Sequence, residues 1–326
     1  MSFYKNKKVL VAGGTGLIGK PLVDELINKE AIVRVASLDN ASRAHPKTEF
    51  KQIDLTKYEN CRDACEGMDF IFNLLCIKGS PKTVNEKPAS LFTPLILFNT
   101  NLMKAAKDCN ASRYLYTSSL GVYPPAEVFY EDNVWNDFPS KNDRFAGTAK
   151  LMGELQAEAY RIEYNWDNIS IVRPANTYGP YDDFNSEAAM VVPSLIKKVL
   201  DGQDPLVIWG DGSQIRDFVY SEDVAKGMTL AMERGINKPM NLGSGTGYTI
   251  KNLVEVITDN VDKKPELKYD ISKPSGDKKR VMDISRANSL MGWKPRYSLE
   301  QGIEKTMNWY KKNKNSLDKR YDSFKD

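Results

Sequence analysis

The sequence predicts an α/β fold, a doubly wound parallel sheet with a smaller C-terminal α/β lobe. Short apolar segments alternate with helical segments through the first 175 residues, which is typical of parallel strands joined by right-handed crossovers. A glycine-rich turn follows the first apolar segment directly, at the carboxyl end of the first expected strand. The segments expected to form buried strands are Val9–Ala12, Ile32–Ala36, Phe50–Ile53, Phe70–Leu75, Tyr114–Ser118 and Ile169–Arg173.

The glycine-rich turn, Gly13–Gly19, is typical of a dinucleotide-binding turn of the Rossmann type. Apolar residues follow it at Leu22, Val23, Leu26 and Ile27, the spacing of one helix face. In such a turn one glycine permits the sharp bend, one lets the backbone approach a pyrophosphate, and one lets the helix pack closely on the strand. A turn that binds nothing is the structural alternative. The residues expected to contact a dinucleotide here are Gly13, Gly16, Leu17, Ile18 and Gly19.

The alternation loosens after Gly179, where Gly- and Pro-rich loops separate the remaining elements. We expect residues 1–175 to form the dinucleotide-binding domain. Residues 176–312 should form mainly a smaller substrate-binding lobe, with some segments returning to the sheet, and residues 313–326 a charged, loosely held tail. The expected elements are a strand over Pro205–Trp209 and helices over Met190–Leu200, Asp223–Met232, Leu253–Asp259 and Leu299–Lys311.

Composition and charge exclude several classes of protein. With 46 basic and 43 acidic residues the net charge is +3, which does not favour nucleic acid as a partner. The four cysteines lack paired metal-ligand spacing and His45 is the single histidine, so we expect no metal site and four free thiols. The first strand begins within about ten residues of the N-terminus, and no apolar run approaches the roughly 18 residues of a membrane span. We therefore expect a soluble, cytoplasmic protein.

Five segments carry a more specific pattern than the glycines alone: Gly13–Gly19, Asp54–Leu55, Thr117–Tyr123, Ala149–Glu154 and Arg173–Pro180. In this order they resemble the extended short-chain dehydrogenase/reductases, in the branch of nucleotide-sugar epimerases and dehydratases. The resemblance spans nearly the whole chain. It implies transfer of a hydride between a nicotinamide cofactor and a nucleotide-diphosphate sugar.

Three later segments are similar to the GDP-fucose synthase group of that branch: Tyr181–Phe184, Val191–Ile196 and Lys273–Arg280. This narrower resemblance implies a GDP-hexose as the favoured substrate and C4 as the reacting carbon. The wider resemblance to the family implies a homodimer, in which helices near Leu91–Lys107 and Arg144–Tyr164 pair across a twofold axis as a four-helix bundle.

The catalytic set of the resembled family is a Tyr, a Lys four residues later and an upstream Ser or Thr. Because i and i+4 share a helix face, the ammonium can lower the pKa of the phenol that exchanges a proton with the sugar. Here Lys150 and Ser119 match, but the Tyr position holds Ala146. An alanine carries no proton, and loss of a general acid or base typically costs about 10²- to 10⁴-fold in rate.

Three explanations of Ala146 are open: a deliberate Tyr-to-Ala replacement, a different proton donor, or a protein that binds a nucleotide sugar without turnover. The candidate donors are Tyr181, near the position of a His in the resembled synthases, and Lys78, after the fourth strand. A surface or substrate-contact role is the alternative for both. The positions of the family's second epimerisation acid and of the dehydratase Asp-Glu pair hold Leu120 and Gly121, so double epimerisation and dehydration are not expected.

The choice between NAD and NADP depends on the loop after the second strand. The residue expected to accept the adenosine ribose hydroxyls falls at Ser37, with Asp39 two residues later and Arg43 nearby. A Ser beside an Arg tolerates a 2′-phosphate, whereas Asp39 favours NAD if the loop brings it back; Arg43 as a solvated charge is the alternative. The resemblance adds four cofactor contacts, namely Asp54, Leu55, Lys150 and Pro174.

The resemblance also implies substrate contacts in the C-terminal lobe. Two guanidinium groups, those of Arg216 and Arg280, suit a diphosphate, whereas surface arginines paired with Asp217 and Asp283 are the alternative. The predicted activity is epimerisation, oxidation or reduction at one sugar carbon with NAD or NADP, and the alternative is a non-catalytic binding protein. The expected substrate-binding set is Lys78, Asn176, Val192, Arg216 and Arg280.

Overall fold

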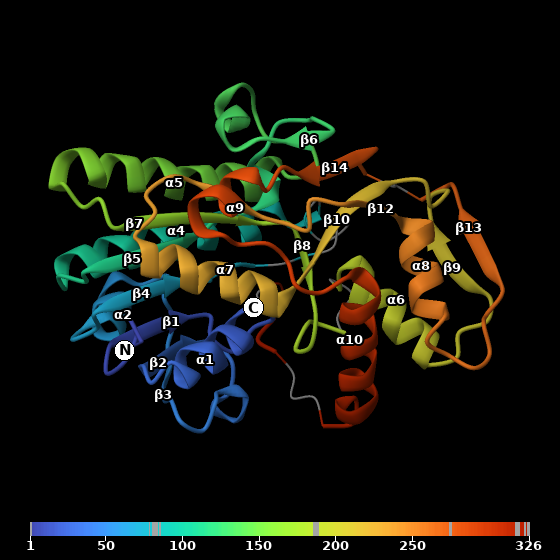
Figure 1. Cartoon of the computed structure of the whole chain (residues 1–326), viewed down its shortest axis with the longest axis horizontal. Helices are drawn as coiled ribbons and strands as arrows, with labels where there is room; N and C mark the ends of the chain where they lie inside the picture. Colours follow the sequence, from blue (N-terminus) through green and yellow to red (C-terminus); the bar gives the residue numbers. More distant parts are fainter. Residues whose placement is uncertain are drawn as a thin grey trace.

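The computed structural model describes the chain apart from residues 1, 78, 80–83, 85, 185–188, 274–275, 317–319, 323 and 325–326. Within the described residues, the central element is a seven-stranded parallel sheet in the order β11-β7-β5-β4-β1-β2-β3 (Figure 1). The expected doubly wound sheet and its six strands are confirmed. The strands are β1 (Lys8–Ala12), β2 (Ile32–Ser37), β3 (Glu49–Gln52), β4 (Phe70–Asn73), β5 (Arg113–Thr117), β7 (Ile169–Pro174) and β11 (Met240–Leu242).

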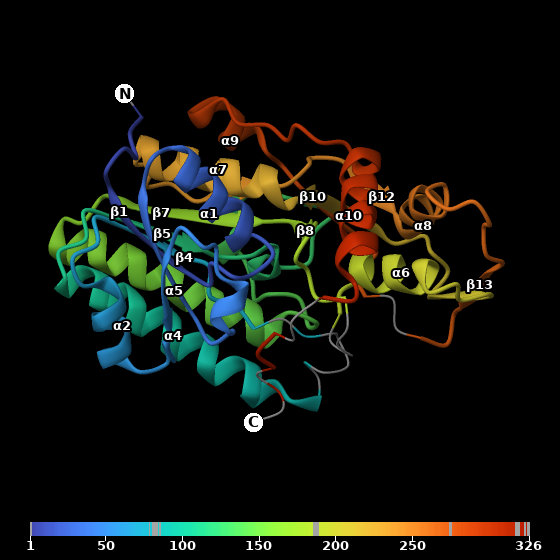
Figure 2. The ribbon, with the colours of Figure 1, turned by 90° about the horizontal axis from the view of Figure 1, so that it is seen from below.

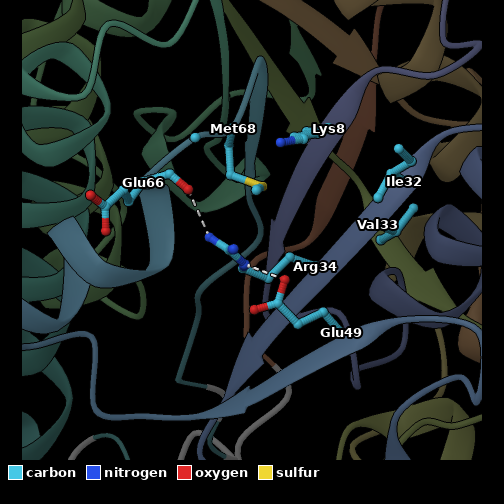
Figure 3. Close-up of a pocket in the computed structure, with 8 residues that line it drawn as sticks. Lys8, Ile32, Val33, Arg34, Glu49, Glu66 and Met68 are labelled. Atoms are coloured by element: carbon cyan, nitrogen blue, oxygen red, sulfur yellow. Dashed lines mark hydrogen bonds and ion pairs between the residues drawn. The ribbon is translucent and has the colours of Figure 1, made fainter.

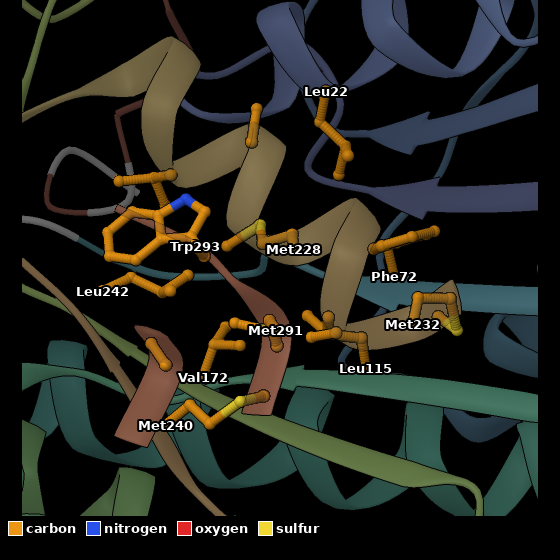
Figure 4. Packing of buried hydrophobic residues seen from close by; sticks show 14 of the residues in the cluster. Leu22, Phe72, Leu115, Val172, Met228, Met232, Met240, Leu242, Met291 and Trp293 are labelled. Carbon is orange, nitrogen blue, oxygen red and sulfur yellow. The ribbon is translucent and has the colours of Figure 1, made fainter. Parts of the chain in front are cut away.

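Helices cover both faces of this sheet (Figure 2). Each face has its own buried apolar cluster, which explains why the strands read as continuous apolar runs. Figure 4 shows one cluster, where Trp293 packs near Met228 and Leu242 and its Nε1 donates to the Asp223 carbonyl at 3.0 Å. On one face lie α1 (Gly19–Asn28), α7 (Ser221–Arg234) and α9 (Ser285–Met291), and on the other α2 (Tyr58–Cys65), α4 (Pro88–Asp108) and α5 (Arg144–Tyr164).

A smaller mixed sheet forms the second region, in the order β12-β10-β14-β6, with β8 also paired to β10. β9 pairs with β13 beside it. The strands of the second region, this separate pair included, are β6 (Val128–Phe129), β8 (Asn176–Tyr178), β9 (Leu206–Trp209), β10 (Ile215–Tyr220), β12 (Gly247–Thr249), β13 (Leu267–Asp270) and β14 (Lys279–Met282). The helices of this region are α6 (Val191–Leu200), α8 (Ile250–Thr258) and α10 (Leu299–Asn313). The described residues also include the short 3₁₀ helices η1 (Ala41–Arg43), η2 (Leu120–Val122) and η3 (Glu131–Trp135).

The two regions exchange strands. β6 precedes residue 175 yet lies in the small sheet, whereas β11 follows it and lies in the large one, paired with β7. β11 thus lies in the large sheet although it comes late in the chain, and the expected domain division stays a prediction. The carboxyl ends of β1, β4 and β5 meet the small sheet along one edge, where ligands bind in folds of this kind.

Local sequence sets several helix ends. Thr249 and Asn252 form a reciprocal capping box at the start of α8, and Ser298 and Gln301 form another at α10. α7 ends at Gly235, whose φ of +61° suits glycine. Among the helices described, none has both the length and the apolar character that crossing a membrane would demand.

The C-terminal tail differs from the expectation that it is loosely held. Its described residues make specific contacts with the large domain: the Tyr321 amide donates to Asp39 Oδ1 at 2.8 Å, and the Phe324 carbonyl accepts from Lys87 Nζ at 2.7 Å. The charged composition of the tail gave no indication of these long-range partners.

Candidate functional site

The glycine turn after β1 is built by close backbone packing. Gly13 has φ +83°, and its carbonyl accepts from the Gly16 amide at 3.2 Å. A Cβ on Gly19 would lie 2.3 Å from the Gly13 oxygen, so α1 could not begin so close to the turn with a larger residue. Leu17 is buried and Ile18 packs against the core, which leaves the backbone of α1's first turn to face the sheet edge.

Gly16 is the open point of this turn. In the described part of the chain, a Cβ there would meet the Gly13 oxygen at 3.5 Å and one flexible side-chain atom, Arg320 Nη2, at 3.3 Å. A ligand can therefore approach the backbone at the N-terminus of α1, where free amides and the helix dipole favour an anion. The residues present fit the pyrophosphate of a dinucleotide.

The loop after β2 does bring Asp39 back to the turn. Thr15 Oγ1 donates to Asp39 Oδ2 at 2.6 Å and lies 2.9 Å from Ser37 Oγ, while the Asp39 amide donates to Ser37 Oγ at 3.1 Å. Arg43 Nε lies 3.7 Å from the same carboxylate, so Arg43 is buried beside Asp39 and is not a solvated charge. The four side chains form one polar cluster at the carboxyl end of β2.

Lys150 is held at the end of β5 and β4. Its ammonium donates to the Thr117 carbonyl at 2.8 Å and to the Leu75 carbonyl at 2.9 Å. Burial lowers the pKa of Lys150. Ala146 lies one turn earlier on α5, where it is half-buried against the apolar cluster between α5 and the large sheet. The position next to Lys150 therefore carries a methyl group only.

Ser119 lies close to α5 because Gly121, two residues later, packs directly against Gly147 of α5. Its Oγ accepts from the Gly121 amide at 3.1 Å, at the start of η2. A Cβ on Gly147 would lie 2.2 Å from the Gly121 oxygen, so η2 rests directly on α5. A Cβ on Gly121 would in turn meet the Asp143 carboxylate at 3.1 Å. Ser119 and Lys150 thus share one edge, with Asp143 beside them.

Arg216 and Arg280 lie side by side, because they are register partners on β10 and β14. Arg280 Nη2 forms an ion pair with Asp143 at 2.7 Å and donates to the Leu120 carbonyl at 3.3 Å, next to Ser119. Burial and the charge of Arg280 lower the pKa of Arg216 to about 10. Two guanidinium groups are therefore held close together beside the catalytic hydroxyl position.

The other expected site residues make structural contacts within the protein. Asn176 Nδ2 donates to the Asp217 carbonyl at 2.9 Å, which ties β8 to β10. Val192 is buried in the core of the second region. Asp54 Oδ1 accepts from the amide and hydroxyl of Thr56, and Leu55 is buried. Pro174 ends β7, in register with Leu242. Their ligand contacts stay predictions.

The two candidate proton donors are not brought to Lys150 by any described contact. Tyr181, with φ +67°, lies between α1 and α10, where its ring contacts Trp309 and the ammonium of Lys20. Lys78 lies outside the described residues. A role for either in proton transfer stays a prediction.

Two residues of the site were not anticipated from the sequence. Thr15 joins the glycine turn to Asp39, and its place inside the glycine motif is the only local signal for this role. Asp143 lies three residues before Ala146, at the N-cap of α5, and that spacing could have indicated a side chain close to the catalytic face.

A buried ion pair lies beneath the site. Arg173 Nε and Nη2 donate to the two oxygens of Glu154 at 2.9 and 2.6 Å, and Ser118 Oγ donates to Glu154 at 2.5 Å. Arg173 Nη1 also donates to Tyr123 Oη and to the Glu131 carbonyl, both at 2.8 Å. This network fixes α5 against β5 and β7.

A small cavity of about 140 Å³ lies at the opposite edge of the sheet (Figure 3). It is lined by the starts of β1 and β2, and Arg34 spans it to Glu49 at 2.9 Å and to the Glu66 carbonyl at 3.0 Å. These contacts join β2 to β3 and to the end of α2. The cavity is therefore remote from the carboxyl edge that carries the candidate site.

Comparison with known proteins agrees with this geometry. GDP-L-fucose synthase 1 of Arabidopsis thaliana is 29% identical over 320 residues, covering 95% of this chain and 94% of that protein. A putative UDP-glucose 4-epimerase of Methanocaldococcus jannaschii is 31% identical, covering 94% and 99%. The UDP-glucose 4-epimerase of Thermotoga maritima, solved with UDP-glucose, superposes with a TM-score of 0.83 at 27% identity, covering 94% and 99%. Residues 9–243 match the NAD dependent epimerase/dehydratase family, to which this chain therefore belongs.

Proposed function

We propose that this protein acts on a nucleotide-diphosphate sugar, at C4 of a GDP-hexose, by oxidation, reduction or epimerisation with NAD. The observation that carries the proposal is the contact of Arg280 with the Leu120 carbonyl, one residue from Ser119. A diphosphate held by Arg216 and Arg280 leaves its sugar within reach of Ser119 and Lys150. The preference for GDP rests on the likeness to GDP-L-fucose synthases.

The chain's own residues have separate roles in this proposal. NAD, when bound, accepts or supplies a hydride at the sugar carbon. Lys150, held by two carbonyls, orients the nicotinamide ribose and keeps a positive charge at the reacting centre. Ser119 orients the sugar oxygen. Arg216 and Arg280 bind the diphosphate in a charge-assisted, directional way.

Proton transfer falls to a group other than residue 146. Tyr181 and Lys78 are the candidates from the sequence, and Asp143 is added because its carboxylate lies against Gly121 and would lose Arg280 to an incoming diphosphate. Replacing the true carrier should lower kcat by about 10²-fold or more. Tyr181→Phe, Lys78→Ala and Asp143→Asn, compared at saturating substrate, identify it.

NAD is preferred over NADP in this proposal because of Asp39. A carboxylate bound to Thr15 in the glycine turn accepts ribose hydroxyls and repels a 2′-phosphate. Arg43, 3.7 Å from the Asp39 carboxylate, weakens this repulsion but leaves the carboxylate in place as the acceptor for ribose hydroxyls.

Ligand titration tests the proposal. The purified protein is titrated calorimetrically with NAD and NADP, and then, saturated with the tighter dinucleotide, with GDP-, UDP- and dTDP-hexoses. NAD should bind more tightly than NADP, and the GDP-sugar more tightly than the other two. Mass spectrometry of copurifying nucleotides gives an independent check. Failure to bind either dinucleotide would contradict the proposal.

A second function, binding without turnover, is favoured by Ala146 alone. Such a protein would bind both ligands but show no change in nicotinamide absorbance when they are mixed. The retained Lys150 argues for catalysis, since burying its ammonium carries a desolvation cost that simple binding does not require.

The protein is further proposed to form a homodimer through α4 and α5. Phe145, Met152, Leu155 and Ile162 are exposed on α5 at spacings of seven, three and seven, which lie on one helix face. Leu97 on the adjacent α4 is exposed as well. Light scattering at micromolar concentration should give a dimer that Leu155→Asp dissociates. A monomeric wild-type protein would rule the dimer out.

A further inference from the structure

The C-terminal segment returns from α10 to the edge of the large sheet, toward the start of α4 (Figure 2). Phe324 anchors it there: its ring lies 3.1 Å from the point where a Cβ on Gly79 would stand, and, like Val84, it packs against the buried core cluster on this face of the sheet. The Phe324 carbonyl accepts from Lys87 Nζ at 2.7 Å. Residues 320–322, which precede this anchor, lie at the dinucleotide turn.

The first tail contact is at the ribose position. The Tyr321 amide donates to Asp39 Oδ1 at 2.8 Å, and Arg320 Nε lies 4.0 Å from Asp39 Oδ2. In the proposed function, the same carboxylate accepts the hydroxyls of the adenosine ribose. The tail therefore uses one oxygen of the carboxylate that the ribose needs.

The second tail contact is at the pyrophosphate position. Arg320 Nη2 lies 3.3 Å from the point where a Cβ on Gly16 would stand. This is the space that the absent side chain of Gly16 keeps open for a ligand. A guanidinium at a helix N-terminus opposes the helix dipole, whereas a pyrophosphate would be favoured there. Asp39 supplies the compensating charge for Arg320.

We propose that residues 320–322 are an internal occupant of the dinucleotide site, displaced when NAD binds. This inference rests on the proposed function for the identity of the ligand. Because both contacts coincide with positions that NAD requires, the tail-bound and NAD-bound forms exclude each other. The apparent dissociation constant for NAD then equals the intrinsic constant divided by the fraction of molecules whose tail is displaced.

Point variants of the full chain test the competition. Arg320→Ala removes the guanidinium from Gly16, and Tyr321→Pro removes the amide that Asp39 accepts. Each should lower the Kd for NAD by about threefold or more, as expected when an occluding state loses population. Lys312→Ala, which removes a positive charge from an exposed position of α10, is the matched control and should leave the Kd unchanged. A weaker NAD affinity in Arg320→Ala would mean that the tail helps to hold NAD, and would overturn the proposal.

Limited trypsin digestion gives a second readout on the wild-type protein. The bond after Arg320 should be cleaved faster when NAD is saturating, because the displaced segment becomes accessible. Protection of that bond by NAD would overturn the proposal. ADP-ribose, which lacks the nicotinamide, should accelerate cleavage equally, since the contacts of Arg320 and Tyr321 are at the adenosine ribose and pyrophosphate positions.

The outcomes separate this inference from the proposed function. If neither the wild type nor any tail variant binds NAD or NADP, the proposed function fails and the inference fails with it. If the wild type and both tail variants bind NAD with equal Kd, and NAD leaves the cleavage rate unchanged, only the inference fails.

Discussion

Arg173 and Arg216 lie at the same edge of the fold, but their surroundings shift the pKa values of the two guanidinium groups in opposite directions. Burial alone would lower the pKa of Arg173, yet the charge and hydrogen bonds of Glu154 outweigh that effect and raise it. For Arg216, burial and the neighbouring charge of Arg280 dominate and lower the pKa. Arg173 has Glu154 as a bidentate partner, whereas Arg216 is held beside the cation of Arg280, and the charges of Asp277 and Asp143 offset that repulsion only in part.

The difference separates a structural charge, Arg173, from Arg216, which we propose binds a ligand. Arg173 is 1% exposed and its guanidinium is satisfied by Glu154, Tyr123 and the Glu131 carbonyl, so a ligand has nothing to add. The electrostatic cost of placing Arg216 beside Arg280 is relieved when an anion binds between them. We therefore expect substitutions around Arg173 to change stability and substitutions around Arg216 to change binding.

The largest expected effect is on stability, in Glu154→Gln. Arg173 would then keep its charge in a buried site without a counter-charge, which typically costs about 3–5 kcal/mol. Urea denaturation measures the change. Asp201→Asn, which breaks the exposed pair with Lys197, is the control and should cost less than about 1 kcal/mol. If Glu154→Gln and Asp201→Asn lowered the free energy of unfolding equally, Arg173 would not depend on Glu154 as a buried counter-charge.

The distinction between residues that serve binding and residues that serve stability also applies to Gly16 and Gly19 of the dinucleotide turn. Gly16→Val should abolish NAD binding, a loss of more than about 100-fold, or about 2.7 kcal/mol, with little change in stability, because its side chain points into the ligand's space. Gly19→Ala should instead destabilise the fold by about 1–3 kcal/mol, since its methyl would overlap the Gly13 carbonyl. Calorimetry and urea denaturation of both variants check this. A Gly16→Val protein that retains full NAD occupancy would show that the site is misassigned.

The smallest of these effects is expected at the substrate edge. Arg216→Ala and Arg280→Ala should each weaken binding of the GDP-sugar by about 1.5–3 kcal/mol while NAD binding and stability hold. Calorimetric titration of each ligand separately measures this. Loss of both ligands to the same extent would indicate a damaged fold instead of a lost phosphate contact.

The sequence predicted well what depends on local patterns. Buried parallel strands are continuous apolar runs and the dinucleotide turn is a contiguous motif, so β1 and the turn at Gly13 were visible in a single segment. The sequence could not predict whether the loop after β2 would bring Asp39 back to the turn. That position depends on a hydrogen bond between Thr15 and Asp39, which are 24 residues apart.

What the sequence missed depends on contacts between distant segments. Nothing in the charged tail indicated that Tyr321 would meet Asp39, 282 residues away. Nothing local showed that Arg280 would face Asp143, since that pair forms only after β14 joins the small sheet. The same limit applies to Val192, whose burial in the second core follows from the packing of α6 and not from its motif.

The central claim is that Lys150 and Ser119 still frame the reacting centre and that only the phenol is absent. The most direct measurement is the rate of nicotinamide absorbance change in Ala146→Tyr, with the GDP-sugar and NAD(H) saturating, beside the unaltered chain and a Lys150→Ala variant of each. The account predicts that the tyrosine accelerates hydride transfer beyond the rate that the other proton carrier supports, and that this gain requires Lys150. A tyrosine variant that binds both ligands and is no faster than the unaltered chain would contradict it.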